Sequence, residues 1–292
     1  MSTGASTKQA TLNTDDEESL DKINPLFASR LLSHHKRVSL LHRILSFHET
    51  KSPKDLIELR SSSKSLRNAL RPPPLWTSFP NSNYASLQSL LDHLEKLHGK
   101  ESSGNVPSLL FIEEGEYVNV AEEEYVKVKI PLSIYGAGCE KTTLVGVGLL
   151  IRGSKSDGSV VIEDLTVQKS TQNGLCAVNG MNLIVRRCKV EMCHSAGVLA
   201  NSVDIFCDNL QVVGCVSSGV FVYNGTVKLS GKNTCIQGNV TSGESDSYGL
   251  DAYSSSSKIQ IVTPLTKETI SINNGGGGNW GGDGTIEQVS KK

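Results

Sequence analysis

The sequence predicts a mainly β protein: a single-stranded right-handed parallel β-helix that follows a small helical module. Two observations predict this fold class. A repeat of 22 to 23 residues, with three short apolar runs in each copy, occupies the second half of the chain. Apolar residues at helical spacing fill the segment from residue 25 to residue 82 instead. With 292 residues, 37% of them hydrophobic, the chain can bury a sizeable core.

The repeat is anchored by Gly174, Gly197 and Gly219, which follow one another after 23 and 22 residues. A looser fourth copy ends at Gly249, 30 residues further on, which indicates an inserted loop at residues 242–247. Four apolar columns align with the anchors: Ile162, Val185 and Cys207; Leu165, Cys188 and Leu210; Val167, Val190 and Val212; and, directly after the glycine, Leu175, Val198 and Val220.

Three short strands in each repeat of this length predict a coil. Each strand pairs in parallel with the equivalent strand one turn later, about 4.8 Å away, and alternate side chains fill the bore. The anchor glycines are expected at sharp turns with positive φ. A leucine-rich repeat has a similar period, but its LxxLxLxxN pattern is absent and no helix fits between the strands.

Four segments follow from these patterns. Residues 1–24 lack hydrophobic periodicity and predict a disordered tail. Residues 25–82 are predicted to form the helical module, whose last helix ends at the prolines at 72–74. Residues 83–272 predict the β-helix, with an amphipathic capping helix over 84–98 that Gly99 terminates. Residues 273–292 predict a flexible Gly-rich carboxy-terminal segment.

Charge and cysteine usage restrict the cellular setting. Residues 34–80 carry 9 basic and 3 acidic side chains, although the whole chain has a net charge of −1. This basic block suits docking on an acidic partner, and a solvated face is the alternative. The polar amino terminus lacks the apolar core of a signal peptide, and the seven cysteines show no metal-type CxxC pair. We therefore expect reduced thiols and a cytoplasmic or nuclear protein.

Residues 84–270 resemble the pectin-lyase-like right-handed β-helix superfamily. The helical stretch ASLQSLLDHL, followed by LLFIEEGEYVNV and IPLSIYGAGCEKTTLVG, is similar to the beginning of that fold. There, a helix caps the open amino-terminal end before the first coil. The resemblance implies the same arrangement here.

A pattern of apolar and charged residues lies between residues 38 and 79: Leu41, Ile44-Leu45, Phe47, Asp55-Leu56, Leu59-Arg60, Ser63-Lys64, Arg67, Leu70 and Leu75-Trp76. In these positions the segment resembles an F-box, the module that binds the Skp adaptor of cullin-type ubiquitin ligases. The usual opening Leu-Pro is missing, the interval between Phe47 and Asp55 is long, and Ser62 and Leu66 replace the usual Val and Trp. The resemblance implies that a Skp-type adaptor binds an apolar face. That face consists of Leu41, Ile44, Leu45, Leu56, Leu59, Leu75 and Trp76.

Catalysis by a carbohydrate-active β-helix would require acidic and basic groups on one outer face. The candidates are Glu163, Asp164, Arg186, Arg187, Asp204 and Asp208. The repeat aligns most of them in two columns: Glu163, Arg186, Asp208 and Lys232, and beside it Asp164, Arg187, Asn209 and Asn233. Alternating charges in such columns pair between neighbouring strands, each pair contributing roughly 0.2–1 kcal/mol. The alignment therefore favours a structural role, and the sequence predicts no catalytic residue.

The sequence also gives little support for a metal site or a sugar-binding site. Cys188, Cys193, His194 and Cys215 lack the spacing of zinc ligands, and their columns favour packing. Tyr117 lies in an approximate GxYxE esterase element in which Asn119 replaces the Glu, so a strand position is expected. The sequence therefore predicts no metal and no cofactor. Tyr223, Tyr248 and Tyr253 form either a patch beside the 242–247 loop or ordinary surface positions.

The sequence thus favours a non-enzymatic protein-interaction scaffold, a substrate-receptor subunit of a cullin-type ubiquitin ligase. Its expected partners are a Skp-type adaptor and a protein substrate, without nucleic acid or membrane. Two alternatives stay open. The chain is a polysaccharide lyase, hydrolase or carbohydrate-binding β-helix, or it is a β-helix interaction protein whose helical segment only caps the coil.

Overall fold

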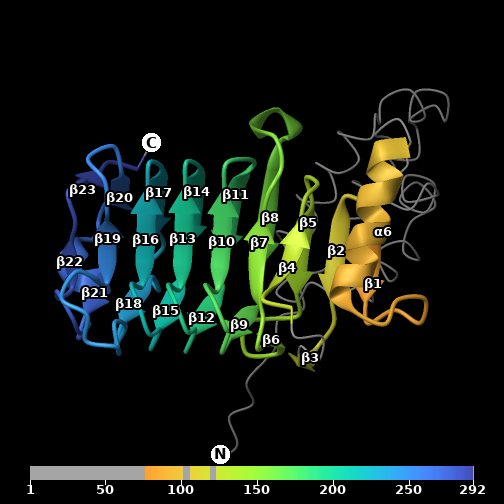
Figure 1. Ribbon diagram of the computed structural model, residues 1–292, viewed down its shortest axis with the longest axis horizontal. Coiled ribbons are helices and arrows are strands. Elements are labelled where there is room, and N and C mark those ends of the chain that lie inside the picture. Colours follow the sequence, from red (N-terminus) through yellow and green to blue (C-terminus); the bar gives the residue numbers. More distant parts are fainter. Residues whose placement is uncertain (1–75, 101–105, 119–122, 292) are drawn as a thin grey trace, which may run out of the picture.

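The computed structural model describes residues 76–100, 106–118 and 123–291, and within them the chain winds into a solenoid of three parallel sheets (Figure 1). Each coil supplies one strand to each sheet in turn, and every strand pairs in parallel with its equivalent in the next coil. Seven strands in each of two sheets correspond to about seven coils. The predicted parallel β-helix is confirmed.

The three sheets are named here by their order along a coil. Sheet 1 contains β1 (Trp76–Phe79), β2 (Leu109–Ile112), β5 (Ser133–Gly136), β8 (Ser159–Glu163), β11 (Asn182–Arg186), β14 (Asp204–Asp208), β17 (Thr226–Ser230), β20 (Lys258–Val262) and β23 (Thr285–Val289). Sheet 2 contains β3 (Gly115–Val118), β6 (Thr142–Val145), β9 (Thr166–Gln168), β12 (Lys189–Glu191), β15 (Gln211–Val213), β18 (Cys235–Gln237) and β21 (Ser271–Ile272). Sheet 3 contains β4 (Tyr125–Val128), β7 (Gly148–Ile151), β10 (Leu175–Val178), β13 (Val198–Asn201), β16 (Val220–Tyr223), β19 (Leu250–Ala252) and β22 (Trp280–Gly281).

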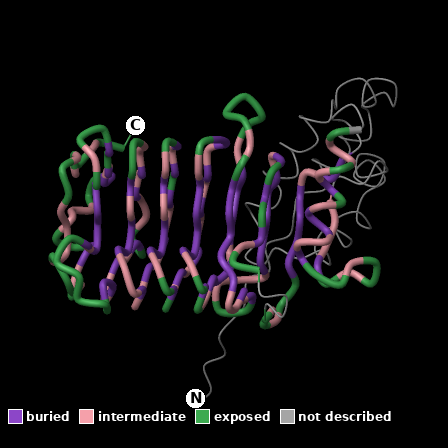
Figure 2. The backbone as a smooth tube through the Cα atoms, viewed as in Figure 1, coloured by how far each residue is buried: buried purple, intermediate pink, exposed green. Residues whose placement is uncertain are grey.

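The core is the bore of the coil, which the predicted apolar columns fill. Val185, Leu210, Val190 and Val198, one from each column, are completely buried and belong to a single apolar cluster. Figure 2 shows these buried segments as stretches that repeat from coil to coil. Alternation along each strand leaves the intervening side chains on the outside, where any functional site must lie.

The anchor glycines differ from the expectation of positive φ, because none of the four adopts it. Their small size matters instead. A Cβ added to Gly174 would lie 2.3 Å from Val190 Cγ1, and one added to Gly197 would lie 2.2 Å from Val212 Cγ1. The positive-φ positions lie elsewhere and include Asp164, Arg187 and Asn209.

Helix α6 (Leu87–Lys100) is the predicted cap, displaced by two or three residues, and it continues one residue past Gly99. Ser86, the residue before the helix, caps its first turn, because its Oγ accepts from the backbone N–H of Ser89 at 3.1 Å. Leu87, Leu90, Leu91 and Leu94 are buried in the core cluster. The helix packs against β4, and Glu95 forms an ion pair at 3.0 Å with Lys129, the residue that follows this strand. Among the described residues, no helix has the length and hydrophobicity to cross a membrane.

The sequence assigned Trp76 to the helical module, but the structure places it at the start of strand β1, at the edge of sheet 1. The β-helix therefore includes residues from Trp76 onward, which were assigned to the helical module. Phe79 turns inward and joins the core. The other six predicted adaptor-binding residues, Leu41, Ile44, Leu45, Leu56, Leu59 and Leu75, lie outside the described residues, as does the predicted disordered tail.

The Gly-rich segment 273–292 was predicted as a flexible tail, but its described residues form the last coil. Strand β22 pairs with β19, and β23 pairs with β20. Glycine is required where the chain packs closely: a Cβ on Gly281 would lie 2.3 Å from the Tyr248 ring, and Gly282 has a φ of +98° beside the Ala252 backbone. The glycines of this segment therefore allow the last coil to pack closely against the preceding one.

The inserted loop lies where the spacing of the fourth repeat predicted it. Twelve residues separate β18 from β19, against six between β15 and β16. Two further residues are inserted between β17 and β18, and together these additions explain the step of 30 residues from Gly219 to Gly249. The strands on either side keep their parallel register.

Candidate functional site

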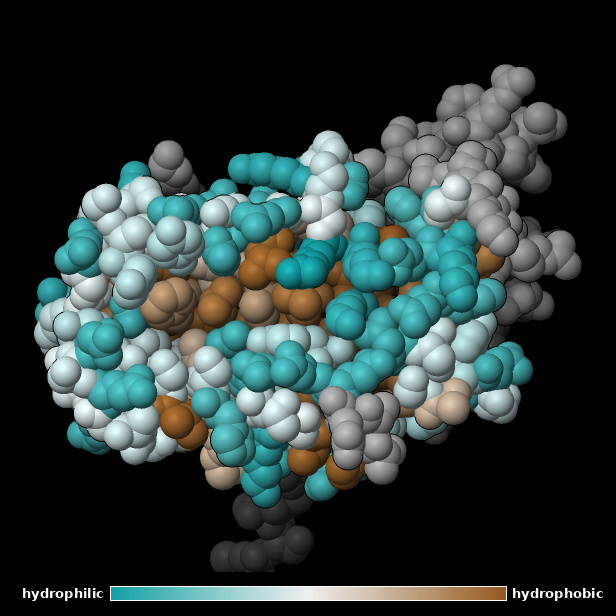
Figure 3. Space-filling view, in the orientation of Figure 1, coloured by the Kyte–Doolittle hydropathy of each residue, from teal (hydrophilic) through white to brown (hydrophobic). Residues whose placement is uncertain are grey.

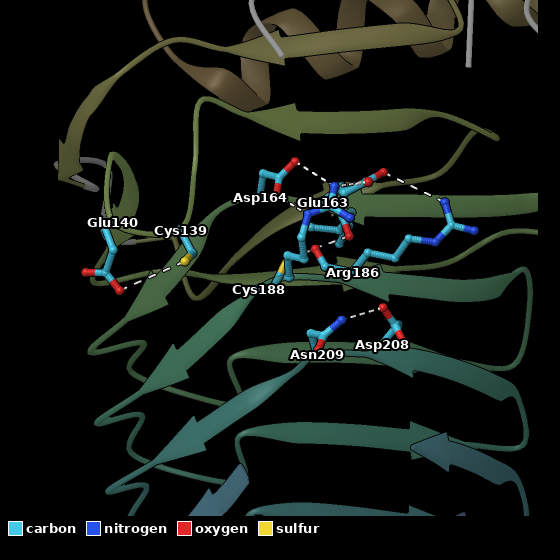
Figure 4. A network of polar contacts seen from close by, with 10 residues as sticks. Cys139, Glu140, Glu163, Asp164, Arg186, Cys188, Asp208 and Asn209 are labelled. Atoms are coloured by element: carbon cyan, nitrogen blue, oxygen red, sulfur yellow. Dashed lines mark hydrogen bonds and ion pairs between the residues drawn. The ribbon is translucent and has the colours of Figure 1, made fainter. Parts of the chain in front are cut away.

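A cluster of charged side chains lies on the outer face of sheet 1, where β8, β11 and β14 end (Figure 4). Arg187 donates from Nε to Asp164 Oδ1 at 2.7 Å and from Nη2 to Asp164 Oδ2 at 2.9 Å, and it also contacts Glu163. Arg186 Nη1 lies 3.8 Å from Glu163 Oε2. Each arginine therefore has an acidic neighbour, as the sequence predicted.

The local backbone places this cluster at a corner of the coil. Asp164, Arg187 and Asn209 follow the ends of successive strands and have φ values of 60°, 49° and 53°. This left-handed conformation is costly for residues other than glycine, asparagine and aspartate. For Arg187, the ion pairs with two carboxylates offset that cost.

The electrostatics of the cluster are those of a neutralised network. The hydrogen bond to Asp164, together with the charges of Asp164 and Glu163, raises the pKa of the Arg187 guanidinium. Burial and the nearby charge of Glu163 raise the pKa of Tyr135, which lies next to Glu163 in the same row. Asp208 accepts from Asn209 Nδ2 at 2.7 Å and from Ser230 Oγ at 3.0 Å.

This arrangement does not favour bond cleavage. General acid–base catalysis by carboxyl groups needs one that is free to exchange a proton with a substrate. Here Glu163 and Asp164 pair with arginines, and Asp208 is held by two donors. Asp204 begins β14, whereas Asp208 ends it, so the structure does not bring that sixth candidate into the cluster. The geometry supports the structural role that the alternating columns predicted.

The predicted columns are wrong in their last members. Strand pairing places Ser230, not Lys232, beside Asp208. Gly231 takes the place beside Asn209 that the column gave to Asn233, since a Cβ on Gly231 would be 2.5 Å from the Asn209 nitrogen. Asn233 still contacts Asn209 from the turn, because its backbone N–H donates to Asn209 Oδ1 at 3.1 Å. The cause is the two-residue insertion after β17, which moves Lys232 and Asn233 off the strand and into the turn.

A second surface with functional potential runs along the outer face of sheet 3, which is the face seen in Figure 3. A band of hydrophobic surface crosses its middle, over β7, β10, β13 and β16. Leu150, Cys176, Leu199 and Phe221 are aligned there by strand register, one residue per coil. We call the following residues the apolar stripe: Leu150, Cys176, Val178, Leu199, Phe221, Tyr223 and Tyr253.

Aromatic rings concentrate at one end of the apolar stripe. The rings of Phe221 and Tyr253 lie 5.3 Å apart between centroids, and those of Tyr223 and Tyr253 lie 6.0 Å apart. Tyr223 is 39% exposed and Tyr253 is 53% exposed. Tyr248, the third tyrosine of the proposed patch, instead packs against Gly277 and Gly281. The patch thus contains Phe221 in place of Tyr248.

A buried carboxyl group adjoins this aromatic end. Asp251 pairs with Phe221 in the register of sheet 3 and is 1% exposed. Ser218 Oγ donates to Asp251 Oδ2 at 2.8 Å, while Oδ1 has no hydrogen-bond partner among the described residues. Burial, with a smaller contribution from Asp246, raises the pKa of Asp251 to about 6.

The apolar stripe was missed in the sequence, although a signal for it exists. The column directly after the anchor glycines was recognised as core, and the next column, Cys176, Leu199 and Phe221, is apolar as well. Apolar residues on both faces of a strand indicate that both faces are covered or bind something. Period-2 alternation alone would have required polar residues there.

The cysteines and histidines form no metal centre in the part of the chain that is described. No group of three or more His, Cys, Asp or Glu side chains there stands close enough to hold a metal ion. All seven cysteines are free thiols. Cys188, Cys193 and Cys215 lie in the core cluster, where they pack as small apolar groups.

The chain was compared with curated proteins and with solved structures. No curated protein matches the sequence. The catalytic domain of a GH87 alpha-1,3-glucanase, solved in complex with tetrasaccharides, shares 16% identity over 66% of this chain, with a TM-score of 0.42. This chain spans 37% of the length of that domain. The A-module of the mannuronan C-5 epimerase AlgE4 from Azotobacter vinelandii shares 14% identity over 73% of this chain and 96% of the module, with a TM-score of 0.21.

A family model covers the central coils. It is described as a right handed beta helix region and matches residues 138–263, from just before β6 to just after β20. Its printed description agrees with the handedness that the sequence predicted. The solenoid is therefore a right-handed parallel β-helix.

Proposed function

We propose that the protein is a non-catalytic interaction scaffold that binds a partner polypeptide along the apolar stripe. The contrast between its two outer faces carries the proposal. The charged groups of sheet 1 pair with one another, whereas the apolar stripe leaves Leu199 and Phe221 partly exposed and Tyr223 and Tyr253 exposed. Contiguous exposed apolar surface marks interaction sites, and aromatic residues frequently anchor them.

Quantitative capture from a cell extract tests this proposal. The full chain, Leu199→Asp and Phe221→Asp are compared with Met192→Asp. Met192 is a suitable control because it is exposed, apolar and outside sheet 3, and its φ of 53° is one that Asp tolerates. We expect a set of proteins that the wild type and Met192→Asp retain and both stripe variants lose at least tenfold. Equal retention by all four proteins would remove the stripe as the binding surface.

The ligase receptor is the cellular role proposed for this scaffold. It rests on the F-box resemblance of residues 38–79, because most of that segment lies outside the described residues. Pull-down of a purified Skp-type adaptor with the full chain tests it. Leu45→Asp should abolish retention, whereas Leu199→Asp should leave it unchanged. An adaptor that does not bind the wild-type chain would leave a scaffold without the ligase role.

Carbohydrate binding is the second candidate, and the aromatic end of the apolar stripe favours it. Exposed rings with polar edges offer the flat apolar surface on which a sugar ring can stack. Affinity electrophoresis in gels that contain pectin, alginate or α-glucan measures such binding. Retardation that Tyr253→Ala and Tyr223→Ala both remove would favour the carbohydrate ligand over the polypeptide.

A further inference from the structure

We propose that the polypeptide bound along the apolar stripe is an amphipathic helix that crosses the strands of sheet 3 and carries opposite charges at its two ends. An acidic side chain of this helix lies over β4 and β7, and a basic side chain lies beside β19. The inference rests on the proposed function, because it describes the partner of that same surface. It adds the secondary structure of the partner and the direction in which its charges run.

One row on the outer face of sheet 3 starts and ends with residues of opposite charge. Val126 and Val128 belong to the core cluster, so Lys127 between them points outward. Strand register continues this row, one residue per coil, through Leu150, Cys176, Leu199, Phe221 and Asp251. Four apolar residues therefore separate a lysine at one end from an aspartate at the other.

The end of the row over β4 and β7 is basic. Lys127 and Arg152, the residue after β7, are exposed, and neither forms an ion pair within the described part of the chain. Burial raises the pKa of the Cys176 thiol to about 11, and the charge of Arg152 opposes that rise, so Arg152 lies close to the stripe. Glu123 and Glu124 precede β4 and therefore lie at the opposite edge of the sheet from Arg152. A carboxylate of the partner is complementary to this end.

The end of the row beside β19 is acidic. Asp251 is buried, whereas Asp246 in the preceding loop and Asp283 in the turn after β22 are exposed. Burial and then the charge of Asp246 raise the pKa of Asp251, so these two carboxylates lie close together. None of the three forms an ion pair with a described residue, and Lys267 lies over the Trp280 ring instead. A basic side chain of the partner is complementary to this end.

The spacing of the coils favours a helix over an extended segment. Successive coils are about 4.8 Å apart, and residues three or four apart on one face of a helix recur every 4.5 to 6 Å or about that. Alternate residues of an extended segment are about 6.7 Å apart, so they lose register with the row after two or three contacts. The five steps from Lys127 to Asp251 span about 24 Å, the length of a helix of about 16 residues.

Backbone hydrogen bonding favours the same occupant. The N–H and C=O groups of sheet 3 pair between neighbouring strands, so its outer face offers only side chains to a partner. An extended segment obtains its affinity from main-chain hydrogen bonds at a sheet edge, which this face does not provide. A helix satisfies its own backbone groups and binds through one apolar face.

Three peptides of about 16 residues, the length of helix that spans the row, test the charge direction. They share one leucine face and differ only at their ends, which carry glutamate and lysine, glutamate twice, or lysine twice. Fluorescence anisotropy measures their affinities for the full chain. The peptide with opposite charges should bind at least fivefold more tightly than either of the others. Equal affinities would contradict the charge direction and leave the stripe as a polypeptide-binding surface without polarity.

Photo-cross-linking locates the two ends of the bound peptide. A benzophenone group beside the glutamate should attach to residues 125–128 or 148–152, and one beside the lysine should attach to residues 246–253. Mass spectrometry of the digested complex identifies the sites. Attachment in the reverse order, or at the same sites from both ends, would refute the proposed orientation.

Charge reversal in the protein provides a second test. Lys127→Glu combined with Arg152→Glu should make the peptide with lysine at both ends the tightest ligand, by at least fivefold. Lys228→Glu combined with Lys258→Glu is the matched control, because it changes the net charge equally on the outer face of sheet 1. Far-UV circular dichroism establishes that both double variants keep the β-helix. The same peptide preference in both would show that the ends of the row do not orient the partner.

A helix-breaking peptide tests the secondary structure of the partner. The version with opposite charges and two central D-amino acids should bind at least tenfold more weakly, and equal binding would indicate an extended partner. Failure of all the peptides to bind would refute the helix, whereas the proposed function falls only if the stripe variants also keep the captured proteins. Binding of α-glucan alone, or self-association that Leu199→Asp removes, would assign the stripe to a carbohydrate or to a second copy instead.

Discussion

The close approach of neighbouring coils limits the size of the side chain that fits at certain positions in this solenoid. Gly197 illustrates this, because a Cβ there would lie 2.2 Å from Val212 Cγ1 and 2.8 Å from the Gly219 carbonyl oxygen. The backbone conformation at this position is open to any residue, so only volume excludes a side chain. Size rather than conformational freedom therefore explains the anchor glycines of the repeat.

Gly197→Ala should destabilise the folded chain by about 1–3 kcal/mol, because an added methyl group in a packed core forces its neighbours to shift. Gly99→Ala is the control, since its Cβ would meet no atom within 4 Å and alanine favours the helix. Urea unfolding followed by circular dichroism measures both. A Gly197→Ala variant as stable as Gly99→Ala would show that the coil spacing relaxes freely.

Asp251 makes stability depend on pH. Its pKa is raised from 3.8 to about 6, chiefly by burial, so the folded state binds this proton more tightly than the unfolded state. The stabilisation is therefore fully present below pH 4 and is lost as the pH rises through about 6. A shift of roughly two units corresponds to about 3 kcal/mol.

Asp251→Asn removes this titration, and unfolding free energies at several pH values measure the difference. Relative to the wild type, the variant should gain stability between pH 4 and pH 7, whatever the other groups contribute to both proteins. A difference that stays constant across this range would mean that Asp251 ionises without cost in the folded state.

Strand ends are where the elements of the solenoid interact through charge. The corner after β8 and the corner after β11 are joined by the paired hydrogen bonds from Arg187 to Asp164. Both side chains are partly exposed to solvent, which limits the strength of the pair. The network nevertheless links two successive coils at a position where the backbone is left-handed.

A double-mutant cycle of Arg187→Ala and Asp164→Asn should give a coupling free energy of about 1 kcal/mol. Arg187→Ala combined with Asp208→Asn is the comparison, because Asp208 is held by Asn209 and Ser230 instead. That second cycle should be close to additive. Equal coupling free energies in both cycles would indicate a general electrostatic effect of Arg187 on nearby carboxylates rather than a specific ion pair with Asp164.

The sequence predicted the elements best where they repeat. The positions of the strands and of the apolar columns in the bore follow from the alternation of apolar and polar residues. Parallel strand pairing keeps equivalent residues aligned from one coil to the next. The expectations for Lys232 and Asn233 were wrong because an insertion in a turn leaves the strands aligned but shifts residue counting. The last coil was missed because glycine-rich strands carry no apolar alternation. The apolar stripe was missed because outward apolar residues imitate core ones.

The whole molecule is a stack in which each coil contacts mainly its two neighbours. Deletion of residues 198–219 removes one strand from each sheet and joins Gly197 to Val220, in the same way that Gly219 now precedes it. The shortened chain should keep a β-sheet circular dichroism spectrum and unfold with a smaller denaturant dependence, because less surface is exposed. Deletion of residues 198–208, half a coil, should abolish folding. Survival of both deletions would argue against strict register.

The apolar stripe inherits the geometry of this stack. Each coil contributes one outward residue to its main row, and successive coils are about 4.8 Å apart. Its length is therefore fixed by the number of coils and not by the sequence of any one of them. Gain or loss of a repeat would lengthen or shorten this apolar surface in equal steps without changing its cross-section. On the proposal that a partner polypeptide binds there, the number of coils would set the length of partner that the solenoid contacts.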